Sequence, residues 1–194
     1  MRSDETLAER LLQTIEADIL PLTKKGVSAG NKIFGAALLR KDTLETYLAE
    51  TNNEIENPLW HGEMHTLKRY YEIPAEKRLP TSELLFLSTH EPCSLCLSAI
   101  TWCGFDNFYY FFSYQDSRDE FAIPHDLKIL KEVFGQESYC SQNEFWNSHS
   151  VYDLIAASDK AATLQTQATE IKEQYAELSS QYQKSKADND IPMN

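Results

Sequence analysis

Apolar side chains recur at every fourth position near the start of the chain, and this spacing predicts an amphipathic helix over residues 5–20. The apolar face is expected to pack on a core and to have no chemical role. Thr6 and Glu9 have the spacing of a capping box at the helix start, and Pro21 is expected to end the helix. The apolar face consists of Leu7, Leu11, Ile15 and Ile19.

Short runs rich in aliphatic and aromatic residues then predict strands. The run 33–39 is almost continuously apolar, which is typical of a strand buried on both faces. It should pair with residues 44–50 across a short turn. Two further strands are expected at 84–88 and 108–112, and a weaker signal places a fifth strand near Tyr139.

Helical segments alternate with these strands. Helices are predicted over residues 60–71, 93–103 and 126–134, and Gly104 should end the second of them. The polar residues 115–120 are interpreted as a solvated loop. Strands that alternate with helices indicate an α/β fold, in which a mixed central sheet carries helices on both faces.

The chain beyond its last glycine carries an apolar 3-4 spacing over residues 154–182, which is typical of a long helix. Because many of the spaced residues are Ala or Tyr, this arm should pack on a partner or on its own domain. We expect a domain over residues 1–150 and a helical extension over 151–194. Phe145 and Trp146 either anchor the arm in the core or cover the mouth of a site. The spaced residues are Leu154, Ala157, Ala161, Leu164, Ala168, Ile171, Tyr175, Leu178 and Tyr182.

Composition restricts the function further. The 194 residues carry a net charge of −12 at pH 7, and Lys and Arg form no cluster, so binding to long nucleic acid is disfavoured. No apolar run approaches the ~18 residues that a membrane span needs, and the charged first residues lack the apolar core of a secretory signal. Four cysteines in a chain of this length do not indicate a disulfide framework. We therefore expect a cytoplasmic protein.

One imidazole and two thiols stand in two short clusters, His61-Gly62-Glu63 and Pro92-Cys93-Ser94-Leu95-Cys96. Zn²⁺ accepts such ligands, and three protein ligands leave a fourth tetrahedral position open. An open position allows the metal to activate water, and Glu63 is close enough in sequence to transfer a proton of that water. The predicted zinc ligands are therefore His61, Cys93 and Cys96, and the predicted catalytic residue is Glu63.

A closed structural zinc site is the alternative, and it would need a fourth protein ligand. His65, His90, Cys103 and Cys140 are the candidates for that ligand. Such a site would make the protein a non-catalytic scaffold whose C-terminal helix binds a partner. Three protein ligands would favour an enzyme, whereas four would favour the scaffold.

The two clusters together resemble the zinc motifs of the cytidine deaminase-like superfamily. Residues 91–102 are similar to the second zinc motif of guanine deaminases and of tRNA adenosine deaminases. The first cluster resembles the equivalent motif of fungal-type cytosine deaminases, and residues 34–39 resemble the first core strand of the family. The resemblance covers roughly residues 5–135. The spacing from asparagine to His61 is shorter than in the family, and the C-terminal extension has no counterpart there.

This resemblance implies a three-layer α-β-α fold with a mixed five-stranded sheet, and Zn²⁺ as the cofactor. It implies a hydrolase that removes an amino group from a nucleobase or nucleoside and releases ammonia. A guanine-like base is the first choice of substrate and cytosine is the second. A tRNA adenosine is the third choice, because the chain is acidic. We also expect a homodimer.

The resemblance also implies roles at the substrate. One of the two asparagines at positions 52 and 53, with Asn52 favoured, would hydrogen-bond the base edge. Phe34 would line the base pocket, and Trp102 would stack on the base or fill the core. The backbone N–H of Gly62 would hold an oxygen of the substrate.

Overall fold

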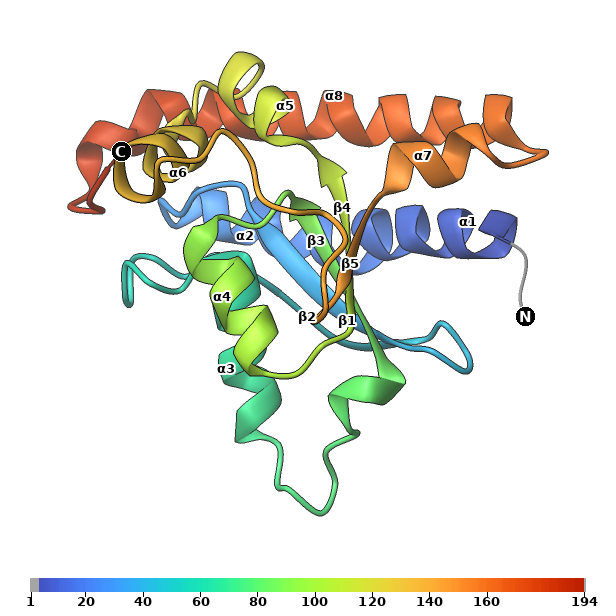
Figure 1. Ribbon diagram of the computed structural model, residues 1–194. Coiled ribbons are helices and arrows are strands. Elements are labelled where there is room, and N and C mark those ends of the chain that lie inside the picture. The colour runs from blue at the N-terminus through green and yellow to red at the C-terminus, as the bar shows by residue number, and fades with distance from the viewer. Residues whose placement is uncertain (1–3, 194) are drawn as a thin grey trace.

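The computed structural model describes residues 4–193, which form three layers (Figure 1). A five-stranded sheet lies between one helical layer made of the N-terminal and C-terminal helices and a second layer made of two central helices. This arrangement confirms the predicted three-layer α/β fold. The core has two parts, one on each face of the sheet.

The sheet is mixed, as predicted, and its strand order is β2-β1-β3-β4-β5. The first strand pairs antiparallel with β2 and with β3, whereas β3, β4 and β5 run parallel to one another. The carboxyl ends of the parallel strands therefore lie at one edge, where ligands bind in open α/β sheets. The strands are β1 (Gly35–Arg40), β2 (Thr46–Thr51), β3 (Leu84–His90), β4 (Asn107–Phe112) and β5 (Asn147–Ser150).

The N-terminal helix runs further than predicted. It consists of α1 (Asp4–Thr14), a π-helical turn (Ile15–Ile19) and α2 (Leu20–Ser28). Pro21 does not end it, because Pro21 occupies the first turn after the wide π turn, where a missing N–H is tolerated. The helix has already begun at Asp4, so Thr6 lies within it and is not its cap.

The opposite face of the sheet is covered by α3 (Gly62–Glu72) and α4 (Ser94–Trp102). Both helices begin at the same edge of the molecule, on the left of Figure 1. A 3₁₀ turn (Thr81–Glu83) precedes β3, and Gly104 ends the α4 segment with a positive φ of 76°. This layer therefore presents two helix starts to one point.

The C-terminal arm packs on its own body. It comprises α7 (Val151–Ala156), α8 (Ala161–Ser185) and a 3₁₀ turn (Lys186–Asp188), and α8 contacts both α1 and α2. The predicted seam is not continuous, because a turn separates the two helices and Ala157 is exposed in it. The buried seam residues of α8 are Leu164, Ala168, Ile171, Tyr175, Leu178 and Tyr182.

Two segments near the site edge differ from the predictions. The stretch expected to be a solvated loop is α5 (Tyr114–Asp119), which Ser113 and Asp116 begin with a capping box. A further helix, α6 (His125–Phe134), follows it as predicted. No strand forms at Tyr139; its ring packs near Phe108 and Trp146 instead, and the fifth strand is β5.

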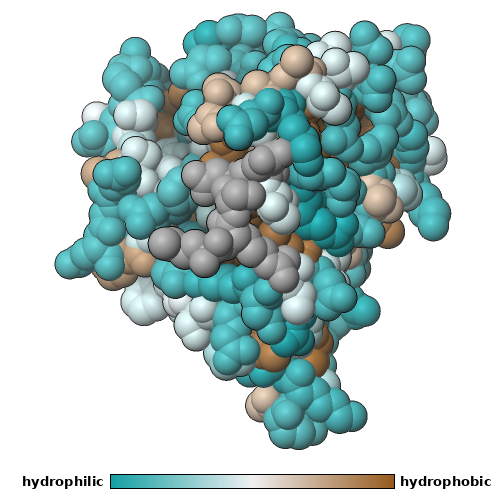
Figure 2. Space-filling view, turned by 90° about the vertical axis from the view of Figure 1, so that its right-hand side faces the viewer, coloured by the Kyte–Doolittle hydropathy of each residue, from teal (hydrophilic) through white to brown (hydrophobic). Residues whose placement is uncertain are grey.

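The surface is mostly polar on the face shown in Figure 2, where hydrophobic residues are scattered. Within residues 4–193, none of the helices has the length and apolar character to cross a membrane. The polar surface is consistent with the net charge of −12.

Candidate active site

Three side chains that could bind a metal meet at the edge where α3 and α4 begin. Cys93 Sγ lies 3.5 Å from Cys96 Sγ and 3.5 Å from His61 Nδ1, and Cys96 Sγ lies 3.8 Å from the same nitrogen. Tetrahedral zinc with ordinary Zn–S and Zn–N bonds requires ligand atoms roughly 3.5–3.8 Å apart. The donor set and its spacing therefore fit Zn²⁺ without rearrangement, and zinc is the cofactor that this group is placed to hold.

Helix starts determine these positions. His61 is the residue that precedes the first turn of α3, and Cys93 is its counterpart at α4, with Cys96 one turn further. Gly62 allows α3 to approach the sheet, because a Cβ at this position would lie 2.6 Å from the Cα of Gly35 in β1. The glycine of the His-Gly-Glu cluster therefore has a packing reason.

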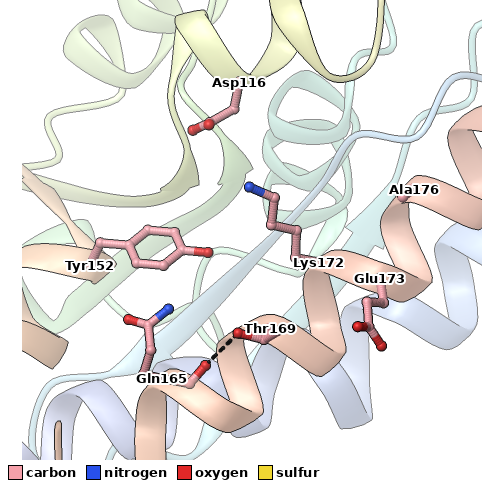
Figure 3. A pocket seen from close by; sticks show the side chains of 7 residues that line it. All are labelled: Asp116, Tyr152, Gln165, Thr169, Lys172, Glu173 and Ala176. Atoms are coloured by element: carbon pink, nitrogen blue, oxygen red, sulfur yellow. Dashed lines mark hydrogen bonds between the residues drawn. The ribbon is translucent and has the colours of Figure 1, made fainter. Parts of the chain in front are cut away.

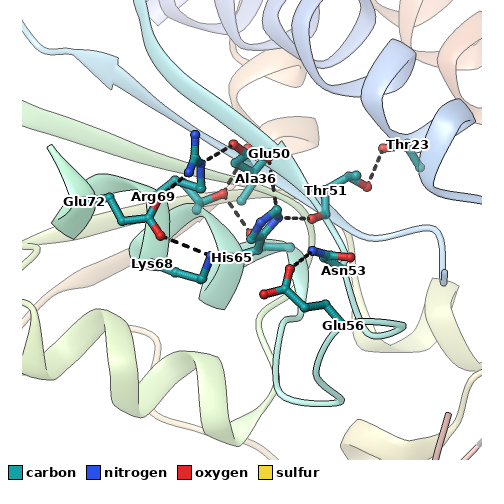
Figure 4. A network of polar contacts seen from close by, with 12 residues as sticks. Thr23, Ala36, Glu50, Thr51, Asn53, Glu56, His65, Lys68, Arg69 and Glu72 are labelled. Atoms are coloured by element: carbon teal, nitrogen blue, oxygen red, sulfur yellow. Dashed lines mark hydrogen bonds and ion pairs between the residues drawn. The ribbon is translucent and has the colours of Figure 1, made fainter.

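His65, the closest candidate for a fourth ligand, is turned away from the cluster. It lies in a network of polar contacts between α3 and β2 (Figure 4). Its Nδ1 is 2.8 Å from the carbonyl oxygen of Thr51 and 3.5 Å from a carboxylate oxygen of Glu50. The imidazole of His65 thus binds the neighbouring strand and not a shared metal.

The other candidates also have different surroundings. Cys103 lies beyond the end of α4, and Cys140 is exposed, with its thiol directed to the carbonyl of Gln142. His90 is buried and its Nδ1 contacts the Thr89 hydroxyl. Among residues 4–193, only the group of His61 and the two cysteines at positions 93 and 96 can hold a metal ion. The three-ligand arrangement is the one that favours an enzyme.

The imidazole and the thiols of the cluster shift one another's pKa. The hydrogen bond between the two thiols and the nearby imidazole of His61 lower the pKa of Cys93 despite its burial. Burial lowers the pKa of His61, but the hydrogen bond and charge of Cys93 outweigh it and raise that pKa to about 9. In the metal-free protein, a protonated imidazole therefore faces a thiolate, and a bound cation would take the place of that proton.

Glu63 stands beside the cluster without being a member of it. It is 4% exposed, and its Oε1 accepts a hydrogen bond of 2.9 Å from the Ser88 hydroxyl. Its Oε2 lies 3.4 Å from Cys96 Sγ. Burial raises the pKa of Glu63, so this carboxylate takes up a proton more readily than a solvated one. The geometry allows proton transfer at the metal position.

A second carboxylate, which the sequence analysis did not single out, lies behind His61. Glu54 Oε1 is 3.8 Å from His61 Nε2 and 2.9 Å from the Lys32 ammonium. Its Oε2 accepts a 2.7 Å hydrogen bond from Asn52 Nδ2. Glu54 therefore connects the far side of the imidazole to the predicted substrate-binding asparagine. In the sequence, the available signal for a buried carboxylate was Lys32, which stands just before the apolar run 33–39 and would need a partner if buried.

A cavity of about 380 Å³ opens next to the cluster, a volume suited to a small ligand. Phe34, His61 and Cys93 line it, and so does Asp126 from the start of α6. Burial raises the pKa of Asp126 to about 8, with further contributions from Cys93 and Glu63. Phe34 was expected here from its resemblance to the family, whereas Asp126 was not expected, because α6 reaches the site only through the tertiary fold.

The two candidate asparagines, Asn52 and Asn53, differ in burial and in hydrogen bonding. Asn52 is 1% exposed, and its Oδ1 has no hydrogen-bond partner among the residues that the structure describes. Asn53 lies in a turn, where its side chain donates to Glu56. Only Asn52 therefore keeps a buried hydrogen-bond acceptor available.

Trp102, Phe145 and Trp146 do not line the cavity. Trp102 is 90% exposed at the last position of α4, roughly 9 Å along the helix from Cys96. The prediction that Trp102 contacts the substrate or fills the core therefore does not hold within a single chain. Trp146 is buried and donates to the Thr101 hydroxyl at 2.7 Å, so it anchors the core, whereas Phe145 is exposed.

A larger groove of about 690 Å³ runs between α5, α7 and α8 (Figure 3). Asp116, Tyr152 and Lys172 lie around it, but Lys172 is engaged by Glu120 at 2.6 Å and Asp116 by Ser113. No His or Cys lines this groove. Volume alone therefore does not identify the site, whereas the converging ligands do.

Comparison with protein families gave one match. The model described as the cytidine and deoxycytidylate deaminase zinc-binding region matches residues 13–112, just over half of the chain. The matched segment contains the three metal-binding residues and Glu63. A search of curated proteins found no match.

Solved structures with a similar fold include a guanine deaminase from Nitrosomonas europaea, with a TM-score of 0.53 and 16% identity over 81% of this chain and 81% of that chain. A guanine deaminase from Bacillus subtilis has a TM-score of 0.51 and 21% identity over 68% and 80% of the two chains. The protein NE0047 in complex with 2,6-diaminopurine has a TM-score of 0.51 and 14% identity over 100% and 88%. At these identities the similarity establishes the fold.

Proposed function

Because the chain belongs to the cytidine and deoxycytidylate deaminase zinc-binding family, we propose that it is a zinc-dependent hydrolase that removes an amino group from a nucleobase or nucleoside. One observation carries the proposal. The group of His61, Cys93 and Cys96 has no fourth protein ligand among residues 4–193, and the buried carboxylate of Glu63 lies beside it. A closed structural site would need the fourth ligand and would have no use for the carboxylate.

In the proposed reaction, water adds to the amino-bearing carbon of the ring, the C–N bond breaks, a carbonyl forms and ammonia leaves. Zinc, when bound, supplies the Lewis acidity that lowers the pKa of water toward neutrality. Ser88 holds Oε1 of Glu63, which leaves Oε2 to transfer two protons in turn. The first passes from the water to the ring nitrogen, and the second passes from the hydroxyl group that has added to the ring carbon to the leaving amine. The raised pKa of Glu63 suits a group that must hold each proton between its uptake and its transfer.

We propose a guanine-like base as the first substrate candidate. Guanine presents two adjacent donors, a ring N–H and an amino group, and such an edge needs acceptors. Asp126, whose carboxyl group lines the cavity, can supply one of them. Asn52, whose buried Oδ1 has no partner among the described residues, would supply the other. Two of the similar solved structures are guanine deaminases, and another binds 2,6-diaminopurine, which supports a purine.

The other candidates have weaker support. Cytosine was favoured by the glycine of His61-Gly62-Glu63, but the contact of Gly62 with Gly35 explains that glycine by packing. A tRNA adenosine is third, because the chain has a net charge of −12. The scaffold alternative loses its partner-binding helix, since the apolar side of α8 is buried on the body.

We also propose a cytoplasmic homodimer. Trp102 and Phe145 are 90% and 59% exposed on segments that Thr101 and Trp146 bring together by their hydrogen bond. Large exposed aromatic side chains of this kind are typical of protein interfaces. Sedimentation of the purified protein and of a Trp102→Lys variant tests this proposal. A monomer at micromolar concentration in both would exclude the dimer.

Ammonia release from the zinc-loaded protein tests the function, with guanine, cytosine, adenine and their nucleosides as substrates. Turnover of at least one of them is expected. Glu63→Gln should retain zinc and lose turnover by about 10²–10⁴-fold, because Gln cannot transfer the proton. Loss of zinc together with activity would mean that Glu63 is a ligand or a structural support, and the proposed mechanism would then be wrong.

A further inference from the structure

His90, the last residue of β3, lies in an aromatic cage next to the site. Its ring is 4.6 Å from the ring of Phe34 and 4.7 Å from that of Phe112, measured between centroids. Phe121 and Tyr175 complete the cage at 5.2 and 5.7 Å. The residue is 2% exposed. An imidazole held in apolar surroundings is costly unless both ring nitrogens are used.

The hydrogen bonds of the Thr89 hydroxyl indicate the tautomer of this imidazole. The Thr89 hydroxyl donates its single hydrogen to the carbonyl oxygen of Gly35 at 3.0 Å and accepts from the Gly35 N–H at 3.0 Å. His90 Nδ1 lies 3.0 Å from the same hydroxyl oxygen. All of these contacts are hydrogen bonds at once only when Nδ1 carries a proton and donates it to the hydroxyl oxygen, so we assign the proton to Nδ1. In the neutral ring, Nε2 is then a bare acceptor.

Nε2 of His90 is buried and has no hydrogen-bond partner in the described part of the chain. The residue lines a small cavity of about 20 Å³, which it shares with Phe34, Glu63 and Asp126. This volume admits about one water-sized group. The small cavity also shares His61 and Cys93 with the larger cavity of about 380 Å³, so it forms an inner part of the candidate active site.

We propose that His90 is a specificity-determining residue, whose Nε2 accepts a hydrogen bond from an N–H group of the substrate. The preferred substrates are therefore bases that present a ring N–H or an amino group to this cavity, and analogues with a methyl group on that nitrogen are rejected. The inference rests on the proposed function, since it places a base in the same cavity.

The surroundings keep this role stable. Burial lowers the pKa of His90 to about 3, so the ring stays neutral at physiological pH and continues to accept. The cage fixes the ring plane, and Thr89 fixes its rotation. A buried ring nitrogen that none of the described protein groups pairs with is typical of a group kept for binding.

The test uses the zinc-loaded Glu63→Gln protein, which should bind bases without converting them. Titration calorimetry measures affinity for guanine and cytosine and for their singly N-methylated derivatives. The same series is measured in Glu63→Gln proteins that also carry His90→Leu, which removes the acceptor at similar volume, or His90→Gln, which retains one. Melting temperatures of all three are recorded without ligand.

With the acceptor present, one N-methylated derivative should bind about tenfold more weakly than its parent base, the loss expected for one hydrogen bond to a buried acceptor. His90→Leu should weaken the parent base by a similar factor and abolish this discrimination, and His90→Gln should restore part of it. The free His90→Leu protein should melt at the same or a higher temperature.

Three other outcomes are decisive. If a base binds and His90→Leu leaves the discrimination unchanged, His90 has no role in specificity, although the proposed function stands. If His90→Leu lowers the melting temperature but affinities stay constant, the residue is purely structural. If no base binds any of these proteins and none is deaminated by the parent protein, the proposed function fails and the inference fails with it.

Discussion

Lys32 and Glu54 form an ion pair in the wall of the site, with 2.9 Å between Nζ and Oε1 and with side chains only 8% and 2% exposed. The same carboxylate faces His61 Nε2 at 3.8 Å, on the side of the imidazole opposite the cysteines. A metal-binding histidine commonly has a carboxylate behind it, which orients the ring and raises its basicity. Lys32 therefore fixes the carboxylate of Glu54, which in turn would orient the zinc ligand His61.

Removing one partner of this pair should lower the free energy of unfolding much more than removing both. Glu54→Gln leaves the Lys32 ammonium buried without a counter-charge, which should lower the free energy of unfolding by about 3–5 kcal/mol. Glu54→Gln combined with Lys32→Met should recover most of that loss. Urea unfolding of the metal-free protein measures both. Glu137→Gln, which breaks an exposed pair with Lys131, is the matched control and should change little. Equal losses in the single and double variants would contradict this interpretation.

Zinc binding should depend on Cys93 and not on cysteines in general. Cys93→Ala removes one of the three ligands, so the zinc content should fall from one ion per chain to a small fraction. Cys140→Ala is the control, since this thiol is exposed and outside the cluster. Elemental analysis after dialysis against a weak chelator measures both. Full zinc content in the Cys93→Ala protein would show that the ligand set is wrong.

Gly62→Ala should destabilise the protein although alanine favours helices. Within a helix, alanine is normally about 1 kcal/mol better than glycine. Here the new Cβ would lie 2.6 Å from the Cα of Gly35, so α3 must move away from β1. We expect a loss of about 1–3 kcal/mol or more in unfolding free energy, and weaker zinc binding because His61 moves with α3. Met64→Ala on the same helix controls for other effects. A stabilised Gly62→Ala protein would refute the close approach.

Asp126 should make the stability of the metal-free protein fall with rising pH. Its pKa is raised from 3.8 to about 8, chiefly by burial. Between these values the unfolded chain carries the carboxylate, whereas the folded protein keeps the proton, so unfolding releases a proton and becomes easier as pH rises. Above pH 8 the effect should level off.

The comparison is made with Asp126→Asn, which cannot titrate. In the presence of a chelator, the unfolding free energy of the Asp126→Asn protein relative to that of the parent should increase from pH 5 to pH 8. A difference that stays constant over this range would mean that the carboxyl group of Asp126 is already ionised in the folded protein.

The metal ligands could be predicted from the sequence because each of the two clusters is local. Two helix starts, each carrying its ligands within one turn, need only be brought together by the sheet, and the strand pattern predicted that sheet. The wall of the cavity is different. Lys32, Glu54 and Asp126 come from three loops or helix ends whose meeting depends on the whole fold, and no spacing in the sequence relates them.

Three predictions were wrong because tertiary structure or local geometry outweighed the sequence pattern. Pro21 usually ends a helix, but the π turn before it provides the wider backbone that it needs. The segment around Asp116 is polar enough for a loop, yet its capping box with Ser113 is sufficient to begin α5. Trp102 lies in the second zinc motif, but it stands at the far end of α4 and faces solvent.

The first and last long helices of the chain pack on each other, since α8 contacts both α1 and α2. During synthesis on a ribosome, α1 and α2 emerge well before the residues of α8 that cover them. At ordinary translation rates the interval is roughly 8–30 s. Throughout this time the apolar faces of α1 and α2 lack that cover. The native core can therefore form only after α8 has been translated, and the nascent chain offers binding surfaces to chaperones until then.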